Sequence, residues 1–145
     1  MKNPEEHYRR LERMYVRART QQFIPSTVEV SEGKAVVRLP ILQSYFHAFD
    51  ALHGAFYFKA MDDAAFFAAN SLVADVAVLT TAFNIHFIRP VTGSSVTATG
   101  IVVSETKRLL IADADLVDEH GREVGRGTGT FMLSEIPLTP EIGYS

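Results

Sequence analysis

The chain is predicted to fold as an α+β domain in which an antiparallel sheet wraps around one long central helix, with an extra helix at the N-terminus. Residues 52–69 form a run that is apolar nearly all round, which is typical of a helix buried in a core. Two segments with alternating apolar and polar residues precede this run, and four follow it. At 145 residues the chain is expected to be a single domain, residues 1–145, around one hydrophobic core.

Residues 1–20 are expected to form the N-terminal helix. Asn3 can cap its first turn, Pro4 suits the first helical position, and Glu6 stands three residues after the cap. An apolar stripe follows at helical spacing and consists of Tyr8, Leu11, Tyr15 and Ala18, with Met14 beside it. This stripe indicates that the helix docks onto the rest of the domain.

The two segments before the central helix, Thr27–Val30 and Ala35–Ile41, are joined by the turn Ser31-Glu32-Gly33-Lys34. This pattern predicts a hairpin. Residues 42–52 connect the hairpin to the helix and are rich in aromatic side chains. Because a surface loop is usually more polar, we expect this connection to lie against a core or a partner.

The central helix is expected to extend to about Leu72, and it carries two adjacent acids, Asp62 and Asp63. A carboxylate in an apolar setting is costly unless it is paired, hydrogen-bonded or neutralised. Chemistry is therefore the leading explanation for acids at this place. Asp63 points about 100° around the helix from Asp62 and is expected to face solvent or an interface.

After the helix the apolar pattern changes to a period of two. The four segments that show it are Ala77–Ile88, Ser95–Ser104, Leu109–Val117 and Glu123–Leu133. Short connections favour antiparallel pairing of consecutive strands. The tail, residues 134–145, contains two prolines and is expected to be extended.

Charge and composition argue against several classes of protein. The net charge is −3 and no nucleic-acid-binding motif occurs, so no nucleic-acid partner is expected. Lys59, Asp62 and Asp63 interrupt the most apolar run, so no membrane-spanning segment is expected. The absence of cysteine excludes disulfides, thiolate catalysis and cysteine-based metal sites, and a cytoplasmic location is expected.

Four short motifs occur in order along the chain. His53-Gly54 is followed by Asp62, nine residues after the histidine, and the other three motifs are residues 81–90, 107–112 and 118–122. Over about residues 25–133 the chain thereby resembles the PaaI-type acyl-CoA thioesterases of the hotdog-fold superfamily. Two positions depart from the family pattern: Ala55 replaces the second glycine of a His-Gly-Gly motif, and His47 replaces an asparagine six residues before the histidine.

The resemblance implies hydrolysis of a thioester and suggests the residues involved. The backbone amides of Gly54 and Ala55 would bind the oxyanion, as free N–H groups at a helix N-terminus can. Asp62 would act as a general base on water or as the nucleophile, and the sequence does not choose between these roles. His53 is expected to orient the loop and the helix start. Thr80 either supports Asp62 or its water, or is an ordinary strand residue.

The spacing within the central helix adds a requirement of its own. Gly54 and Asp62 are eight residues apart, which corresponds to about 12 Å along a helix axis. One thioester carbonyl cannot lie within hydrogen-bond reach of both residues in one subunit. If both serve one thioester, the helices of two chains must pair across a two-fold axis. The expected assembly is therefore a homodimer or a dimer of dimers.

The resemblance also suggests where coenzyme A, which is part of the acyl- or aryl-CoA substrate, would bind. Arg89, Lys107 and Arg108 lie where the family often meets the phosphates of coenzyme A. His47 and Phe46 belong to the aromatic-rich connection and are candidates for contacts with the substrate. No separate cofactor is expected.

The same residues suggest further sites and functions. No metal site is expected, because ligand spacing is absent among His47, His53, His86 and Asp62. A non-catalytic acyl-CoA-binding or structural hotdog dimer is the alternative function, since it would share the fold and the pocket. A hydratase or dehydratase is disfavoured, because no Asp/His loop of that type occurs. The sequence does not predict acyl chain length or a preference for aryl groups.

Overall fold

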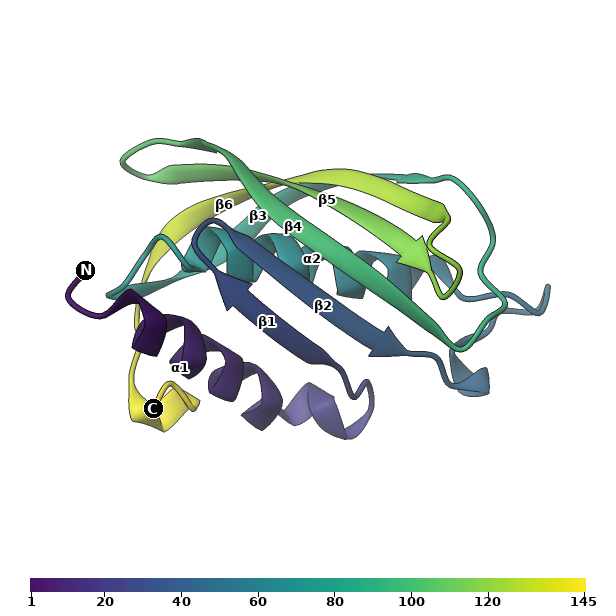
Figure 1. The fold of residues 1–145 in the computed structure, drawn as a ribbon, viewed down its shortest axis with the longest axis horizontal. Helices are drawn as coiled ribbons and strands as arrows, with labels where there is room; N and C mark the ends of the chain where they lie inside the picture. Colours follow the sequence, from purple (N-terminus) through teal and green to yellow (C-terminus); the bar gives the residue numbers. More distant parts are fainter.

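The long helix α2 packs against one face of a six-stranded antiparallel sheet, which wraps around it (Figure 1). The computed structural model describes the whole chain, residues 1–145. The α-helices are α1 (Pro4–Arg17) and α2 (Gly54–Asn70), and the 3-10 helices are η1 (Arg19–Gln22), η2 (Gln43–Tyr45) and η3 (Pro140–Ile142). The strands are β1 (Thr27–Ser31), β2 (Lys34–Pro40), β3 (Val76–Phe87), β4 (Ser95–Glu105), β5 (Leu109–Asp118) and β6 (Glu123–Pro137). These elements confirm the predicted α+β fold. None of the helices has both the length and the apolar character needed to cross a membrane.

The strand order is β1-β2-β4-β5-β6-β3. Consecutive strands pair as expected, except that β3 pairs with β6 and β4 pairs with β2. The expectation that β3 and β4 pair is therefore wrong. Three strand spacings of about 4.8 Å separate β4 from β3. The connection of residues 88–94 covers this span, because an extended chain reaches about 3.3 Å per residue.

Small residues allow α2 to lie close to β4. Ala60, Ala64 and Ala68 of α2 are fully buried. A Cβ atom on Gly100 of β4 would lie 2.4 Å from the backbone carbonyl carbon of Ala64. A larger residue at either position would push the helix away from the sheet, and with it the site that the helix carries.

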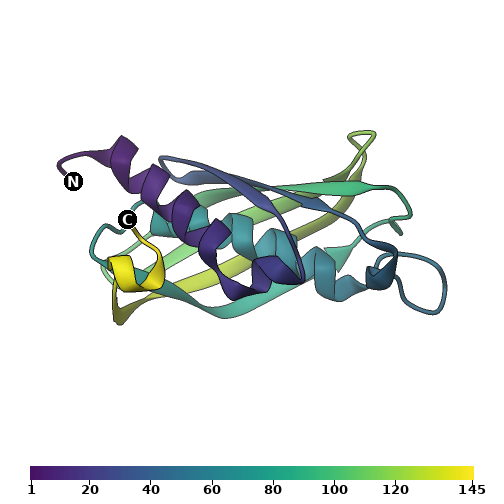
Figure 2. The ribbon, with the colours of Figure 1, turned by 90° about the horizontal axis from the view of Figure 1, so that it is seen from below.

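The helix α1 packs along β1, and the C-terminal segment returns to lie beside α1 (Figures 1 and 2). Asn3 caps α1 as expected, because its side chain accepts a 3.2 Å hydrogen bond from the Glu6 N–H. Tyr8, Leu11 and Tyr15 of the predicted stripe are buried. Ala18 is exposed, since α1 ends one residue before it.

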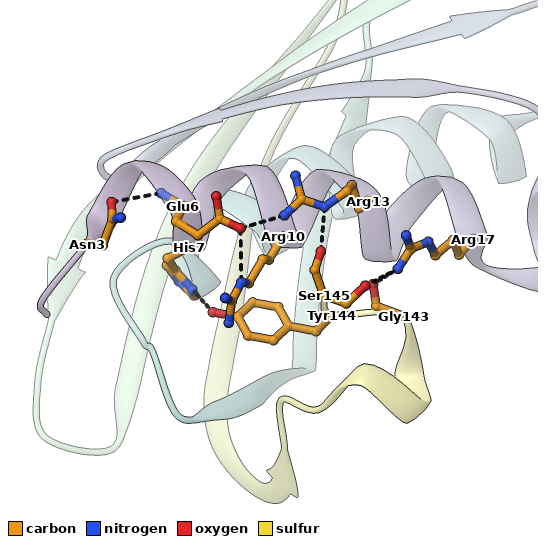
Figure 3. Close-up of polar contacts among 9 residues, drawn as sticks. All are labelled: Asn3, Glu6, His7, Arg10, Arg13, Arg17, Gly143, Tyr144 and Ser145. Atoms are coloured by element: carbon orange, nitrogen blue, oxygen red, sulfur yellow. Dashed lines mark hydrogen bonds and ion pairs between the residues drawn. The ribbon is translucent and has the colours of Figure 1, made fainter.

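The tail of residues 134–145 differs from the extended segment that was expected. Strand β6 continues to Pro137, and η3 then turns the chain back onto α1. The hydroxyl of Tyr144 lies 2.7 Å from His7 Nδ1, and the Gly143 carbonyl accepts a 3.0 Å hydrogen bond from Arg17 (Figure 3). On its other side, His7 Nε2 lies 2.9 Å from the carbonyl oxygen of Asn70, the last residue of α2. The two ends of the chain thus meet at the C-terminal end of the central helix.

Candidate active site

The helix α2 begins at Gly54 with an open backbone amide. His53 is the N-cap residue, and its Nδ1 accepts a 2.9 Å hydrogen bond from the Ala55 N–H. The Ala55 amide, which was expected to bind an oxyanion, is thus already engaged. The Gly54 N–H has no acceptor within the chain. Of the two expected donors, Gly54 is the one that can receive a ligand.

A pocket of about 370 Å³ lies beside this amide. Gly54 and Tyr57 of α2 line it together with Phe87 at the end of β3. The wall is mainly apolar, and His47 and Arg89 add polar groups to it. A mostly apolar hollow with a few polar groups is the usual form of a small-molecule site.

The Phe87 ring packs directly on Gly54. A Cβ atom at residue 54 would lie 2.9 Å from Cε1 of Phe87, so glycine permits this approach. The same ring lies 5.3 Å from the Tyr57 ring, measured between centroids. The Tyr57 hydroxyl donates a 2.5 Å hydrogen bond to the Arg89 carbonyl and so ties the pocket wall to α2.

Asp62 lies near the middle of α2 and is partly buried. Its Oδ1 accepts a 2.7 Å hydrogen bond from the Thr80 hydroxyl of β3. Burial raises the pKa of Asp62 to about 6; the Thr80 hydrogen bond and the Lys59 charge partly oppose this rise, while Asp63 adds to it. A carboxyl group with a pKa this close to neutrality can act as a base near pH 7.

Asp63 is already paired. Its Oδ2 accepts a 2.7 Å hydrogen bond from the Tyr15 hydroxyl and forms an ion pair with Lys59. Only 16% of its side chain is exposed. Of the two expectations for Asp63, solvent or an interface, the solvent-facing one is therefore wrong, because α1 reaches Asp63 through Tyr15, 48 residues earlier in the chain.

The structure keeps Gly54 and Asp62 apart within one chain. They stand eight residues apart on a continuous helix, a separation of about 12 Å. Asp62 does not line the pocket beside Gly54. The face of α2 that carries Asp62 is only partly covered by β3. Thr80 contacts Asp62 and the Phe83 ring lies 5.6 Å from the Phe58 ring, measured between centroids, but Ala55 and Phe58, at helical spacing from Asp62, remain exposed.

The predicted substrate-binding residues of the connection lie at the N-terminal end of α2. His47 lines the pocket, and its Nδ1 accepts a 3.1 Å hydrogen bond from the Phe49 N–H. Phe46 packs partly against the core and does not line the pocket. Arg89 lies at the pocket, and its guanidinium donates a hydrogen bond to the Glu123 carbonyl.

Lys107 and Arg108 lie far from Arg89 within the chain. They belong to the turn between β4 and β5. Lys107 shares a second hollow with Leu72, just beyond the C-terminal end of α2, whereas Arg89 lies beside the first residue of that helix. One chain therefore does not bring the three predicted cations together.

The histidines near the site do not form a metal cluster with acids. The His47 and His53 rings lie 6.3 Å apart, measured between centroids, and His86 is on β3. No group of three or more His, Cys, Asp or Glu side chains is arranged to hold a metal ion.

Sequence reasoning missed three residues at or beside the site: Tyr15, Lys59 and Phe87. A signal existed for Lys59, because its spacing from Asp63 is that of an ion pair on one helix. The predicted apolar stripe indicated that Tyr15 is buried but not that it binds Asp63. Phe87 gave no signal, since its contact with Tyr57 depends on how β3 crosses α2.

An antiparallel sheet wrapped around one helix that carries an open N-terminal amide and a partly buried carboxyl group defines a hotdog-fold protein of the thioesterase type. The family model of the thioesterase superfamily matches residues 49–125, and the chain belongs to this family. Its membership places the chain among the thioester hydrolases.

Solved structures share the fold at low sequence identity. The Escherichia coli PaaI protein from the phenylacetic acid degradation operon has a TM-score of 0.85 and 22% identity, over 94% of this chain and 99% of that one. A Haemophilus influenzae thioesterase has a TM-score of 0.76 and 14% identity, over 84% and 87% of the two chains. A variant of the Thermus thermophilus phenylacetic acid degradation protein PaaI has a TM-score of 0.72 and 22% identity, over 79% and 98%. No sequence of a curated protein matches the chain.

Proposed function

We propose that the chain hydrolyses an acyl- or aryl-CoA thioester at a site completed by two copies of the chain. Asp62 supplies the general base or the nucleophile, and the Gly54 N–H binds the oxyanion. The observation that carries the proposal is the setting of Asp62. This carboxyl group is hydrogen-bonded by Thr80, has a pKa near 6 and lies on a face of α2 that β3 covers only in part.

The proposed chemistry begins when an oxygen atom attacks the thioester carbonyl carbon. As a general base, Asp62 takes a proton from the attacking water, and the departing coenzyme A thiolate later receives that proton. As a nucleophile, Asp62 attacks the carbonyl carbon, the C–S bond breaks and the coenzyme A thiolate leaves. Water then cleaves the resulting mixed anhydride into the free acid and the Asp62 carboxylate. Thr80 binds Oδ1, whereas Oδ2 makes no hydrogen bond in the chain and is available for either role.

In both routes negative charge develops on the carbonyl oxygen. The Gly54 N–H is aimed away from the helix body and has no acceptor within the chain. The positive end of the helix dipole adds to its effect. One such donor typically contributes about 10²-fold or more to the rate of acyl transfer.

A second copy of the chain would bring the two half-sites together. Pairing two α2 helices across a two-fold axis sets Gly54 of one chain near Asp62 of the other. Phe58 of α2 is 41% exposed and Phe87 of β3 is 59% exposed, so apolar surface is available for the contact. Strand β3 is an edge of the sheet, and a free edge can pair with another copy. The proposed assembly is a homodimer or a dimer of such dimers.

Coenzyme A enters as part of the substrate, and the chemistry assigned to Asp62 and Gly54 needs no cofactor. Arg89 lies beside the Gly54 half-site, whereas Lys107 and Arg108 lie beyond the other end of α2. Replacing Arg89 alone, or Lys107 and Arg108 together, distinguishes which set meets the phosphates, because loss of a phosphate contact raises KM more than it lowers kcat.

The proposal is tested with a panel of acetyl-, octanoyl-, benzoyl- and phenylacetyl-CoA and a thiol reagent that detects released coenzyme A. The chain has no cysteine, so the reagent reports only the product. We expect Asp62→Asn to lose at least about 10²-fold of the activity. The variant still accepts the Thr80 hydrogen bond through its amide oxygen. The matched control is Asp115→Asn, which changes an exposed carboxylate on β5.

Two outcomes contradict the proposal in different ways. Unchanged activity in Asp62→Asn overturns the assigned mechanism. If the wild type hydrolyses none of the thioesters but still binds them, the chain is a non-catalytic acyl-CoA-binding protein.

A further inference from the structure

A polar cluster beside Asp62 links α1 to the site helix. The Tyr15 hydroxyl donates a 2.7 Å hydrogen bond to Asp63 Oδ2, and the Lys59 ammonium donates to the same oxygen. Lys59 Nζ also lies 5.1 Å from the centre of the Tyr15 ring, a distance suited to a cation–π contact. The Ser26 hydroxyl, 2.6 Å from the Tyr15 oxygen, completes the cluster.

The cluster is largely withdrawn from water. The Lys59 and Asp63 side chains are 19% and 16% exposed, and Tyr15 is 5% exposed. A partly buried ion pair gains little stability over apolar residues of the same size, because both charges lose hydration. The cluster therefore needs a reason other than stability. Tyr15 lies outside residues 49–125, which match the family model.

The Lys59 ammonium pairs with Asp63, and Lys59 stands three residues before Asp62 on the same helix. Residues three and four positions apart are neighbours on a helix surface, so Lys59 stands beside both acids. The groups that act on Asp62 are Thr80 from β3 and Lys59 and Asp63 from α2. Lys59 is the only cation among them, and Asp63 is the only anion.

We propose that Tyr15, Asp63 and Lys59 form a positioning unit in which the Lys59 ammonium and the Tyr15 hydroxyl offset the charge of Asp63 and so limit its repulsion of the Asp62 carboxylate during the reaction. The inference rests on the proposed role of Asp62. Asp63 and Tyr15 anchor Lys59 so that it does not extend into solvent. In return, Lys59 and the Tyr15 hydroxyl partly compensate the charge of Asp63, which would otherwise repel a negative charge on Asp62 more strongly.

The direct test follows the ¹³C signal of the Asp62 carboxyl carbon through a pH titration, with Asp62→Asn used to assign the signal. Lys59→Met removes the cation and should raise the midpoint. Asp63→Asn removes the anion, keeps an acceptor for Tyr15 and should lower the midpoint. Each change should be about half a pH unit, as for a unit charge roughly 6 Å away in a water-like dielectric.

Two further variants separate position from charge. Tyr15→Phe keeps the ring but leaves Asp63 less compensated, so the Asp62 midpoint should rise by less than in Lys59→Met. Lys59→Arg keeps the cation and should restore a midpoint close to that of the wild type. Lys34→Met, on the exposed surface of β2, makes the same chemical change away from the site and should leave the midpoint unchanged.

The pH dependence of the catalytic rate provides a second test. The acid limb of kcat/KM should move with the carboxyl midpoint, so that Lys59→Met loses about threefold of the wild-type rate below the midpoint and little above it. A purely structural cluster would lower the melting temperature in these variants and leave the midpoint of Asp62 in place. That result, or shifts of Lys59→Met and Asp63→Asn in the same direction, overturns the inference.

The titration also separates this inference from the proposed function. If Asp62→Asn remains fully active, the proposed mechanism fails whatever the titration shows. If Asp62→Asn is inactive and the midpoint does not move in the cluster variants, only the positioning unit is refuted.

Discussion

The Thr80 hydroxyl donates a 2.7 Å hydrogen bond to Asp62 Oδ1, and this contact attaches the carboxyl group of α2 to strand β3. The bond restricts the Asp62 side chain and assigns different surroundings to its two oxygens. It also favours the charged form, so it lowers the pKa of a carboxyl group that burial raises to about 6. Thr80 therefore acts on both the orientation and the charge of Asp62.

Replacing Thr80 with valine keeps the shape of the side chain and removes the donor. Because a hydrogen bond to a charged group contributes about 1.5–3 kcal/mol, we expect the acid limb of the rate profile to move to higher pH by about one unit or more. The measurement is kcat/KM between pH 5 and pH 9. Thr80→Ser keeps the hydroxyl and should retain the wild-type limb. Equal profiles for the two variants would show that the hydroxyl does not affect Asp62.

Proline at residue 54 tests the oxyanion donor directly. Gly54 is the first residue of α2, where proline is well accepted, and His53 has the extended backbone that a following proline requires. Gly54→Pro removes the N–H and should lower kcat by about 10²–10³-fold. Gly54→Ala is the matched control, because it keeps the N–H and meets the same Phe87 ring. Equal losses in the two variants would assign the effect to crowding against Phe87.

The raised pKa of Asp62 also predicts how stability depends on pH. The folded protein holds the proton with a pKa of about 6, against an ordinary value of 3.8. Above pH 6 the folded state must therefore carry a disfavoured charge, at a cost of up to about 3 kcal/mol. This cost disappears as the pH falls through 6 towards 3.8.

Asp62→Asn carries no such charge and should be more stable than the wild type at pH 8. A gain of this size raises the melting temperature of a chain of this length by several degrees, at roughly 3 °C per kcal/mol. The difference between the two proteins should shrink as the pH is lowered to 4. A constant difference across this range would mean that the effect does not come from the ionisation of Asp62.

The contact between His7 and Tyr144 predicts the opposite dependence on pH. A carbonyl oxygen only accepts, so His7 Nε2 donates to Asn70 and the neutral Nδ1 accepts from the Tyr144 hydroxyl. Burial lowers the pKa of His7. Stability from this group is therefore fully present above the ordinary histidine pKa and is lost as the pH falls below it.

His7→Gln can make both hydrogen bonds without titrating. Between pH 8 and pH 5 its melting temperature should fall less than that of the wild type. Identical slopes for the two proteins would show that His7 does not contribute to the acid sensitivity of the junction in Figure 3.

The hydrophobic pattern predicted the elements of the fold but not all of their partners. The caps and periods of residues 3–17 and 54–70 depend on neighbouring residues, so the sequence indicates them. The pairing of β3 with β6 depends on the connection of residues 88–94, whose path is set by the assembled sheet. A short connection was therefore not a sufficient guide to pairing.

The sequence likewise predicted some residues of the candidate site and not others. Asp62 was identifiable because a carboxyl group in an apolar helix needs an explanation. The contact from Thr80 was one of two interpretations of a strand threonine, and the folded chain brings the two side chains together. The engagement of Ala55 by His53 was missed, because a capping side chain competes for the same amide that a ligand would use. The pairing of Asp63 could not be predicted from the sequence, because only the tertiary structure places Tyr15 beside it.

The shared site makes a prediction about mixtures of inactive chains. Gly54→Pro and Asp62→Asn each disable both sites of a homodimer, but a mixed dimer keeps one site with an intact Gly54 and an intact Asp62. Refolding an equal mixture should give half mixed dimers, and hence about one quarter of the wild-type activity. The measurement is hydrolysis after the two variants are unfolded and refolded together, and separate refolding before mixing is the control. If the mixture stays inactive although mixed dimers are detected by mass, Gly54 and Asp62 do not belong to one cross-subunit site.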